Sequence, residues 1–244
     1  MRVLIVGGTS AIAAETAKAF ASEGAHLFLT GRNSAKLEAV AEDLRVRGAA
    51  RVTTARLDVA DIASHGRVME SAIAALGGLD VVLVAHGTLP NQARCQERVE
   101  DTLEALHVNL TATIALLTLL ANELESRRSG CLAVITSVAG DRGRQTNYVY
   151  GTAKGAVGIF LQGLRGRLLR SNVAVLTIKP GFVDTPMTAA VRKNLLFADA
   201  GRVGRGIHRA ITRRKDVVYL PWFWRPIMGL ISGLPERVYK RLHF

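Results

Sequence analysis

The chain opens with the sequence MRVLIVGGTSAIA, residues 1–13, in which a short apolar run leads through two glycines into a helical pattern. The run Arg2–Val6 has the length and the Val, Leu and Ile content of a buried β-strand. Gly7 allows the backbone to approach a ligand closely, and the helix expected from Ala11 presents its N-terminus to the same place. Because a helix N-terminus favours negative charge, this strand–turn–helix unit predicts a site for the pyrophosphate of a dinucleotide.

The same alternation of strand and helix continues along the chain. The runs expected as strands are Arg2–Val6, Ala25–Thr30, Arg51–Leu57, Asp80–Ala85, Cys131–Ser137, Val173–Ile178 and Val217–Leu220. Helical spacing of apolar residues is found over Ala11–Ser22, Ser34–Val46, His65–Leu76, a long stretch near Glu97–Glu125, and Tyr148–Leu169. Continuously apolar strands are buried on both faces, which indicates a parallel sheet covered by helices. Right-handed connections then give an α/β, doubly wound Rossmann fold.

No internal repeat or low-complexity linker divides the 244 residues, a length that fits one α/β domain with a sizeable core. We expect residues 1–215 to form this Rossmann domain together with its active site. Residues 216–244 are expected to form an aromatic and basic tail. This tail either belongs to the same domain or extends from it toward a membrane or another subunit.

Composition and charge exclude several classes of protein. Charged residues make up 21% of the chain and hydrophobic residues 49%, which is typical of a globular protein. The two cysteines have no metal-ligand spacing, so no metal site is predicted. The formal net charge of +12 favours anionic partners, but no nucleic-acid-binding motif accompanies it, and nucleic acid is not expected. A signal peptide would need a longer apolar region and a cleavage site, so we expect a cytoplasmic protein.

The chemistry is expected from the stretch Tyr150-Gly151-Thr152-Ala153-Lys154, preceded by Ser137 at the end of an apolar run. On a helix, residues i and i+4 share a face, so Tyr150 and Lys154 point into the same space. An ammonium group there is expected to lower the tyrosine pKa from about 10, which makes the phenol usable as a general acid or base. The Ser137 hydroxyl could polarise a carbonyl that the tyrosine then protonates. This is the chemistry of carbonyl reduction.

The Tyr-x-x-x-Lys spacing alone is a weak signal, because an amphipathic helix with a buried tyrosine and a solvated lysine produces it too. Together with the serine, the strand before it and the N-terminal glycine turn, it resembles the short-chain dehydrogenase/reductase family over essentially the whole chain. The resemblance implies that Ser137, Tyr150 and Lys154 are catalytic. It adds Asn109, which in the family supports a water that links the lysine to solvent. It also implies a homodimer or homotetramer formed through long helices.

The resemblance implies a nicotinamide dinucleotide cofactor as well. The family turn Gly-x-x-x-Gly-x-Gly keeps its first glycine at Gly7, whereas Ala11 and Ala13 stand at the second and third glycine positions. The implied cofactor residues are Gly7, Thr9, Ser10, Ala11, Ile12, Arg32, Asp58, Val59, Ala85, His86, Gly87, Tyr150, Lys154, Pro180, Gly181, Val183 and Thr185. The segment from Met187 to about Val203 is expected to be the substrate lid.

Two of these positions have simpler alternatives. Asp58 can equally be an ordinary acid of a strand-end turn. His86 stands where the family has an asparagine, and we do not expect it to be catalytic.

The form of the cofactor is expected from the end of the second strand. NAD-specific folds place an acidic residue there on the ribose hydroxyls, whereas Leu29-Thr30-Gly31-Arg32-Asn33 contains none. The guanidinium of Arg32 suits a 2′-phosphate, so NADP(H) is the preferred cofactor. If Arg32 is only a solvated loop charge, NAD(H) is open as well.

Two features outside the general family pattern concern the substrate. Arg142 and Arg144 lie on a glycine-rich loop between Ser137 and Tyr150, where they could bind an anionic substrate or form a solvated basic loop. The tail holds both tryptophans beside an apolar stretch that is too short and too broken by Pro and Gly to span a bilayer. It suits an interfacial membrane anchor, or a segment buried in the core or a subunit interface, and both are open.

The tail, the segment Ala85-His86-Gly87-Thr88-Leu89-Pro90 and the arginine loop resemble a narrower group, reductases of decaprenylphospho-2-keto-pentofuranose. This resemblance implies a lipid-linked anionic ketone and a peripheral position on the cytoplasmic membrane face. The sequence therefore predicts an NADP(H)-preferring enzyme of the EC 1.1.1 type that reduces a ketone to a secondary alcohol. Two alternatives are kept: a reductase of 3-oxoacyl thioesters or other lipid ketones, and a non-catalytic dinucleotide sensor that kept the fold.

Overall fold

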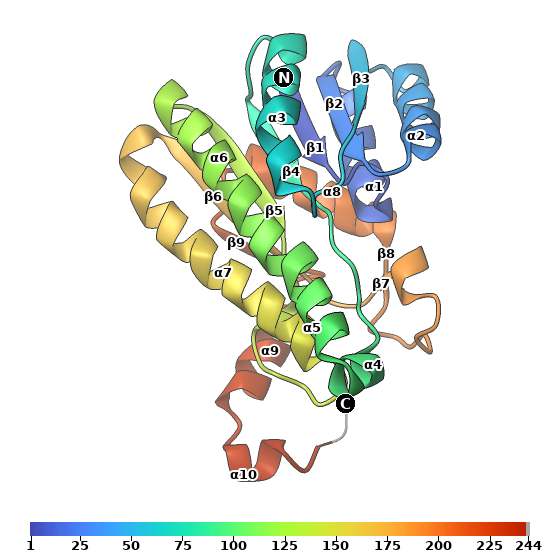
Figure 1. Cartoon of the computed structure of the whole chain (residues 1–244), viewed down its shortest axis with the longest axis vertical. Helices are drawn as coiled ribbons and strands as arrows, with labels where there is room; N and C mark the ends of the chain where they lie inside the picture. The colour runs from blue at the N-terminus through green and yellow to red at the C-terminus, as the bar shows by residue number, and fades with distance from the viewer. Residues whose placement is uncertain (243–244) are drawn as a thin grey trace.

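A sheet of seven parallel strands forms the centre of the computed structural model, which describes residues 1–242 (Figure 1). The strands are β1 (Arg2–Val6), β2 (His26–Gly31), β3 (Arg51–Arg56), β4 (Val81–Val84), β5 (Gly130–Ile135), β6 (Val173–Pro180) and β9 (Val217–Leu220). Their order is β3-β2-β1-β4-β5-β6-β9, and every pair runs parallel. This confirms the doubly wound arrangement expected from the sequence.

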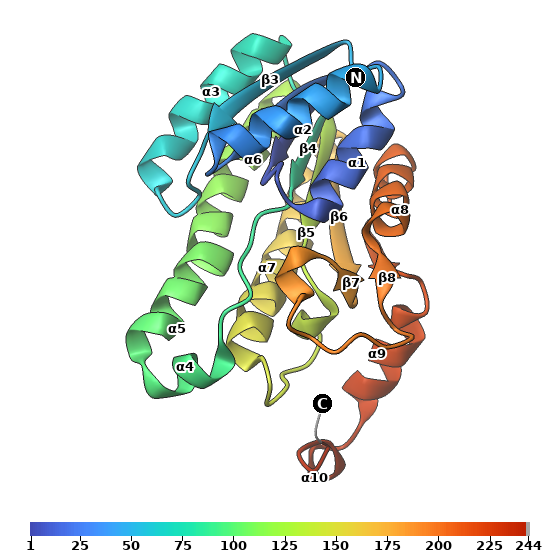
Figure 2. The ribbon, with the colours of Figure 1, turned by 90° about the vertical axis from the view of Figure 1, so that its right-hand side faces the viewer.

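Helices cover both faces of this sheet (Figure 2). One face carries α1 (Ala11–Ala21), α2 (Ser34–Val46) and α8 (Ala200–Thr212). The other carries α3 (His65–Leu76), α6 (Ala112–Arg127) and α7 (Tyr148–Leu168). Successive strand residues alternate between the two cores. In β1, Val3 and Ile5 join the first core, and Leu4 and Val6 the second. Burial on both faces is why the strand is apolar throughout.

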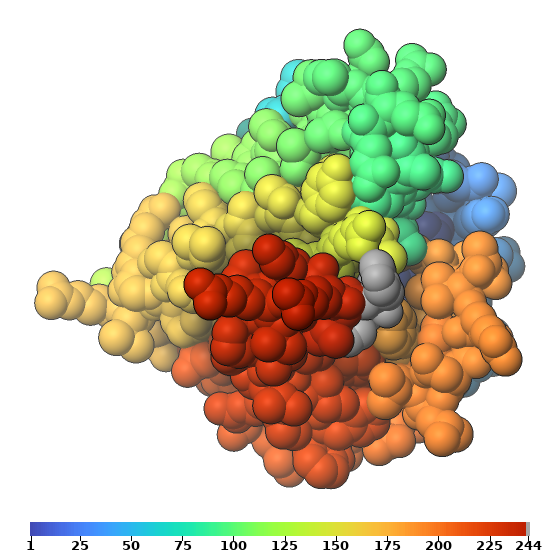
Figure 3. Space-filling view, turned by 90° about the horizontal axis from the view of Figure 1, so that it is seen from below, coloured from blue at the N-terminus to red at the C-terminus, as the bar shows by residue number. Residues whose placement is uncertain are grey.

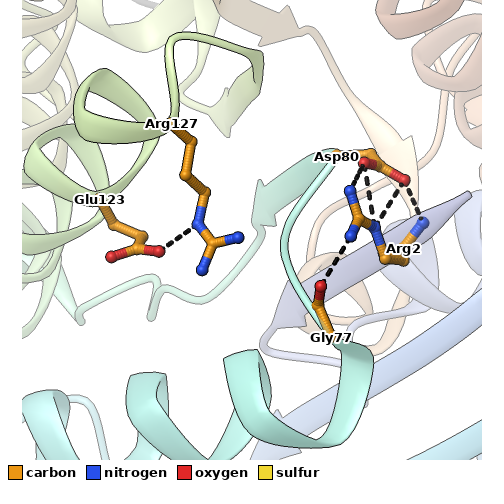
Figure 4. A network of polar contacts seen from close by, with 5 residues as sticks. All are labelled: Arg2, Gly77, Asp80, Glu123 and Arg127. Carbon is orange, nitrogen blue, oxygen red and sulfur yellow. Dashed lines mark hydrogen bonds and ion pairs between the residues drawn. The ribbon is translucent and has the colours of Figure 1, made fainter.

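An ion pair joins the ends of β1 and β4 where these strands begin (Figure 4). Nη2 of Arg2 donates to Oδ1 of Asp80 at 2.5 Å, and the Arg2 backbone N–H donates to Oδ2 at 2.8 Å. Nη1 of Arg2 also donates to the carbonyl of Gly77, just after α3. Nearby on α6, Arg127 pairs with Glu123. These contacts close one end of the sheet, so functional residues collect at the opposite end, where the parallel strands finish.

The predicted long helix near Glu97–Glu125 is present as one helix, Val99–Arg127, which contains a π-helical turn. The structure has α4 (Gln92–Glu97), α5 (Val99–Leu106) and a π-helical turn over His107–Thr111, which leads into α6. Apolar spacing cannot reveal this turn, because it inserts one backbone residue without interrupting the apolar pattern. By length and composition Val99–Arg127 could cross a membrane. Its buried leucines pack into the second core, which makes it a core helix: Leu116, Leu117, Leu120 and Leu124.

The predicted lid is shorter than expected. After a short helix, Pro186–Thr188, the chain reaches β8 (Ala198–Asp199), which pairs with β7 (Val183–Asp184). The last residues assigned to the lid, from Ala200 to Val203, instead form the first turn of α8. Within this helix, Gly204 allows α8 to pack closely on α1.

The first part of the tail forms the last strand of the sheet, and the rest of the tail forms two short helices. β9 is an edge strand of the main sheet, and α9 (Trp224–Gly233) and α10 (Glu236–Tyr239) follow it. On α9, Trp224 and Met228 are buried and pack with Val138. Trp222 and Leu230, by contrast, are each 72% exposed. The alternative of a tail buried in the core therefore holds for one face of α9 only.

Replacing Gly204 of α8 by alanine is expected to destabilise the protein. The added Cβ would lie 2.8 Å from the carbonyl carbon of Glu15 and from the backbone nitrogen of Thr16 in α1. Two helix backbones would have to separate, which costs about 1–3 kcal/mol. The matched control is Gly163→Ala in α7, where nothing lies within 4 Å of the new Cβ.

For the control Gly163→Ala, the free energy of unfolding is expected to rise by about 0.5–1 kcal/mol, because alanine is a better helix former than glycine. Denaturant unfolding of both variants measures the difference. Equal effects of the two substitutions would contradict the close packing of α8 on α1.

Candidate active site

A cleft of about 240 Å³ opens where the strands of the sheet finish. It lies between the β1–α1 turn, the ends of β2, β3 and β4, and the segment after β7. The predicted cofactor residues that line it are Gly7, Thr9, Ser10, Ala11, Ile12, Arg32, Asp58, Val59, Ala85, His86, Gly87 and Thr185. Leu57, Thr88 and Val108 also line it and were not predicted. Thr88 and Val108 come from segments whose position depends on the π turn.

The β1–α1 turn is built to admit a ligand at the N-terminus of α1. Gly7 has a φ of +87°, and a Cβ there would lie 2.7 Å from the backbone nitrogen of His86. Only glycine therefore fits between this turn and the end of β4. The Ser10 side chain, at the N-cap of α1, makes no capping hydrogen bond, which leaves the N–H groups of the first turn to a ligand. Ala13 is fully buried in the core, so its methyl group occupies space between helix and sheet.

The polar atoms of the cleft fit a ligand rich in hydroxyls. Oγ1 of Thr30 and Nδ1 of His86 are buried and have no hydrogen-bond partner within residues 1–242. Nε2 of His86 lies 2.9 Å from Oγ1 of Thr113. Burial, and then the charge of Lys154, lower the pKa of His86 to about 3, so the ring is neutral. The riboses of a dinucleotide would supply partners for both orphaned atoms.

The end of β2 presents positive charge to the cleft. Arg32 is exposed, and Asn33 caps α2 by accepting a hydrogen bond from the Lys36 backbone N–H at 2.9 Å. Arg56, at the end of β3, donates from Nε to the carbonyl of Arg32 at 3.4 Å. Arg56 was not predicted, because its position beside Arg32 follows from the β2–β3 register and from no motif.

Ser137, Tyr150 and Lys154 lie together beside this cleft. Ser137 follows β5, where its Oγ accepts from the Ala139 backbone N–H at 3.1 Å and hydrogen-bonds the Tyr150 hydroxyl. Nζ of Lys154 donates to the carbonyl of Ile135 at 3.1 Å. The same Nζ lies 5.7 Å from the centre of the Tyr150 ring, so the two side chains share one helix face as the spacing predicts.

The π turn places Asn109 at the same site. Asn109 is buried, donates from Nδ2 to the carbonyl of Ala105, and accepts at Oδ1 from the backbone N–H of Thr88, each at 3.0 Å. A Cβ on Gly87 would lie 3.0 Å from Oδ1 of Asn109 and 3.3 Å from Nζ of Lys154. The amide and the ammonium group therefore converge on Gly87, which is part of the cleft wall.

The expected effect of Lys154 on Tyr150 is wrong. Burial raises the pKa of Tyr150 to about 12, against the hydrogen bond from Ser137, and burial lowers the pKa of Lys154 to about 8. The ammonium group lies beside the ring and is hydrogen-bonded to Ile135, so desolvation outweighs its attraction for a phenolate. At neutral pH the phenol holds its proton, as a proton donor must.

One predicted cofactor segment lies away from the cleft. Pro180, Gly181 and Val183 do not line it. Gly181 faces the tail instead: a Cβ there would lie 1.9 Å from the indole nitrogen of Trp224, and its backbone N–H donates to Leu220. Val183 is buried in the first core. Within residues 1–242, no group of three His, Cys, Asp or Glu side chains could hold a metal ion.

The structure corrects the predicted substrate role of Arg142. Its Nη1 donates to the carbonyls of Ile231 and Leu234 at 2.7 and 2.6 Å, and its Nη2 pairs with Glu236 at 2.9 Å. The guanidinium also stacks over the Tyr239 ring, 3.9 Å from its centre. Arg142 therefore holds the C-terminal end of α9, and its donors are occupied. Arg144, two residues on, is buried under the same helix.

The buried Lys154 predicts a specific pH dependence of stability. Its pKa is about 8 in the folded protein and 10.5 when unperturbed. Between these values the unfolded chain binds the proton more tightly, so stability rises with pH. As the pH rises across this range, the free energy of unfolding of the wild type is expected to increase by about 3 kcal/mol relative to that of Lys154→Met.

Urea unfolding of both proteins from pH 7 to 11 measures this difference. Tyr150 acts in the opposite direction above pH 10, but it does so in both proteins, so it cancels in the comparison. Parallel pH profiles would show that Lys154 is not desolvated.

Comparisons with known proteins agree with this geometry. The family model described as short chain dehydrogenase matches residues 1–196. An uncharacterized oxidoreductase of Mycobacterium tuberculosis is 36% identical over 240 residues, covering 98% of this chain and 96% of that protein. One from Streptomyces coelicolor is 33% identical over 241 residues, covering 98% and 95%. A solved short-chain type dehydrogenase/reductase from Mycobacterium ulcerans has a TM-score of 0.79 over 89% of this chain and 87% of its own. At 23% identity it shows the fold alone.

Proposed function

Because the chain belongs to the short-chain dehydrogenase family, we propose that this oxidoreductase prefers NADP(H) and reduces a ketone to a secondary alcohol. The observation that carries the proposal is the meeting of Ser137, Tyr150 and Lys154 beside the cleft that the predicted cofactor residues line. A hydroxyl, a protonated phenol and a buried ammonium group are what protonation of a carbonyl oxygen requires.

Each side chain then has a defined task. The cofactor, held by the β1–α1 turn, the ends of β2 to β4 and Thr185, supplies the hydride when bound. Tyr150 donates its phenolic proton to the substrate oxygen, and the Ser137 hydroxyl hydrogen-bonds that oxygen and fixes its position. Lys154 offsets the negative charge that the phenol acquires, while Asn109 and the Lys154 ammonium group, meeting at Gly87, return a proton from solvent.

The preference for NADP(H) is supported by the charges around the end of β2. Arg32 and Arg56 lie together there, and the β2–α2 connection from Arg32 to Ser34 contains no carboxylate that could hold a ribose 2′-hydroxyl. A 2′-phosphate would pair with guanidinium groups, whereas a bare hydroxyl gains little from them.

Arg32→Ala is expected to weaken NADPH binding about tenfold, because one charge-assisted contact is lost, and to leave NADH binding nearly unchanged. Calorimetric titration with both cofactors measures the two effects. The control is Arg51→Ala, at the opposite end of β3. Equal binding of NADPH and NADH, unchanged by Arg32→Ala, would refute the preference for NADP(H).

Tyr150→Phe is expected to lower turnover at least about 100-fold while NADPH binding stays within about twofold, because only the proton donor is removed. The control is Tyr148→Phe, which changes an exposed tyrosine at the first position of the same helix, α7. Turnover is followed as NADPH oxidation with a panel of ketones. Retained activity in Tyr150→Phe would refute the assignment of the donor.

The alternative functions can be distinguished by the substrates that the protein turns over. A reductase of 3-oxoacyl thioesters would turn over an acyl-thioester ketone faster than a phosphorylated keto sugar, whereas the lipid-phosphate-linked keto sugar reading expects the reverse. A non-catalytic sensor would oxidise NADPH with neither. The joint burial of Asn109 and Lys154 at Gly87 favours an enzyme, because a binding module has no use for a desolvated ammonium group there.

We also propose that the tail contacts an anionic lipid surface. Its exposed face carries Trp222 and Leu230 together with Arg225, Arg237 and Lys240, and Figure 3 shows the tail (red) and the shortened lid (orange) on one face of the molecule. Exposed tryptophan and leucine beside basic residues suit the lipid headgroup region. The expected homodimer or homotetramer stays a prediction.

The double variant Trp222→Ser, Leu230→Ser is expected to lose most binding to phosphatidylglycerol vesicles, because its apolar contact with the headgroup region is removed. Flotation of each protein with these vesicles and with neutral phosphatidylcholine vesicles measures this binding. The control is Val46→Ser, an exposed apolar side chain at the end of α2. A wild type that does not float with anionic vesicles would refute membrane contact.

A further inference from the structure

Arg144 is buried without a counter-charge among the described residues, 1–242. It is 9% exposed, its Nε is buried and makes no hydrogen bond, and its one polar side-chain contact within residues 1–242 is the sulfur of Met228, 3.4 Å from Nη2. A thioether is a weak acceptor, and a guanidinium does not lose its proton in proteins. A full positive charge is therefore enclosed with almost nothing to stabilise it.

The neighbouring acids are already engaged. Asp141 accepts from Nζ of Lys179 at 2.5 Å and from the Tyr219 hydroxyl at 2.9 Å. Glu236 is paired with Arg142. The loop thus contains two arginines in opposite situations: Arg142 is satisfied by the tail, and Arg144 is left with a sulfur atom.

Arg144 lies between the two catalytic groups and the tail. Its loop connects Ser137 to α7, and Met228 packs in one cluster with Val138, the residue after Ser137. The carbonyl of Arg144 accepts from the backbone N–H of Asn147, which immediately precedes α7. The Arg144 backbone is therefore held close to the start of the helix that carries Tyr150, and its guanidinium contacts Met228, which lines a second cleft together with Ser137 and Lys154.

Two further polar atoms near the start of α7 have no partner in the part of the chain that the structure describes. Gln92, on α4, uses Oε1 to accept from the backbone N–H of Val149 at 3.1 Å, which leaves its Nε2 buried and unpaired. Oδ1 of Asn147 is also buried and unpaired. With Nε of Arg144, the start of α7 therefore has two unsatisfied donors and one unsatisfied acceptor. Orphaned buried groups at this density are expected where a ligand completes them.

We propose that these three residues recognise the substrate, with Arg144 and Gln92 binding a phosphate or carboxylate group and Asn147 accepting from a hydroxyl. The substrate class is then a hydroxylated ketone that carries an oxyanion. The inference deepens the proposed function and rests on it for the position of the reacting carbonyl. A guanidinium fork suits either oxyanion, because both offer two oxygens in one plane.

The test measures anion binding to the full chain saturated with NADPH, so that the phosphate contacts of the cofactor are already filled. Inorganic phosphate and acetate are titrated calorimetrically into wild type, Arg144→Met and Arg144→Lys. The control is Arg209→Met, an exposed arginine on α8 that lies outside the tail. Thermal unfolding of all four proteins is recorded in parallel.

Arg144→Met is expected to weaken binding of the preferred anion at least tenfold, Arg144→Lys to weaken it less, and Arg209→Met to change it by less than twofold. The anion that binds more tightly to wild type identifies the group on the substrate. Arg144→Met is also expected to unfold at the same temperature as wild type or higher, since it removes an unpaired buried charge.

Equal anion affinities of wild type and Arg144→Met would overturn the proposal. So would a marked fall in unfolding temperature, or failure to fold, in Arg144→Met, because either result would show that the protein itself pairs this charge. If NADPH does not bind at all, the proposed function fails separately. The comparison between wild type and Arg144→Met is then made on the chain alone and still decides the role of Arg144.

Discussion

The close contact between the β1–α1 turn and the end of β4 is the constraint on which the site depends. A Cβ on Gly7 would lie 2.7 Å from the backbone nitrogen of His86, so the two chain segments touch with no side chain between them. The next residue, Gly87, is where Asn109 and Lys154 converge. The cofactor cleft and the catalytic groups are therefore joined through the single stretch Ala85–Gly87, and neither can move without the other.

Burial sets the protonation states of the polar groups at the proposed active site. Lys154 and Asn109 are buried, and the surroundings that lower the pKa of the ammonium group also keep the Tyr150 phenol protonated. Desolvation makes each of these interactions stronger than it would be in water. Burying the charged groups of Lys154 and Arg144 lowers the stability of the folded protein. Such a loss is common where a side chain is positioned for function.

The tail contributes to the active-site end of the molecule as well as to its surface. β9 completes the sheet, Trp224 packs against Gly181, and Arg142 caps the carbonyls at the end of α9. The loop after Ser137 is thereby fastened to the tail, and the space above the catalytic groups is bounded by residues far apart in the sequence.

Sequence alone was sufficient for the strands, for most helices and for the cleft residues of the β1–α1 turn, because apolar periodicity and glycine act locally along the chain. It also predicted that Tyr150 and Lys154 share a helix face, which follows from helix geometry. It did not reveal helix α8, Arg56 beside Arg32 or the different partners of Arg142 and Arg144. Each of these depends on contacts between distant segments, and the sign of the Tyr150 pKa shift depends on burial. Only the tertiary structure decides which groups lose water and which charges find partners.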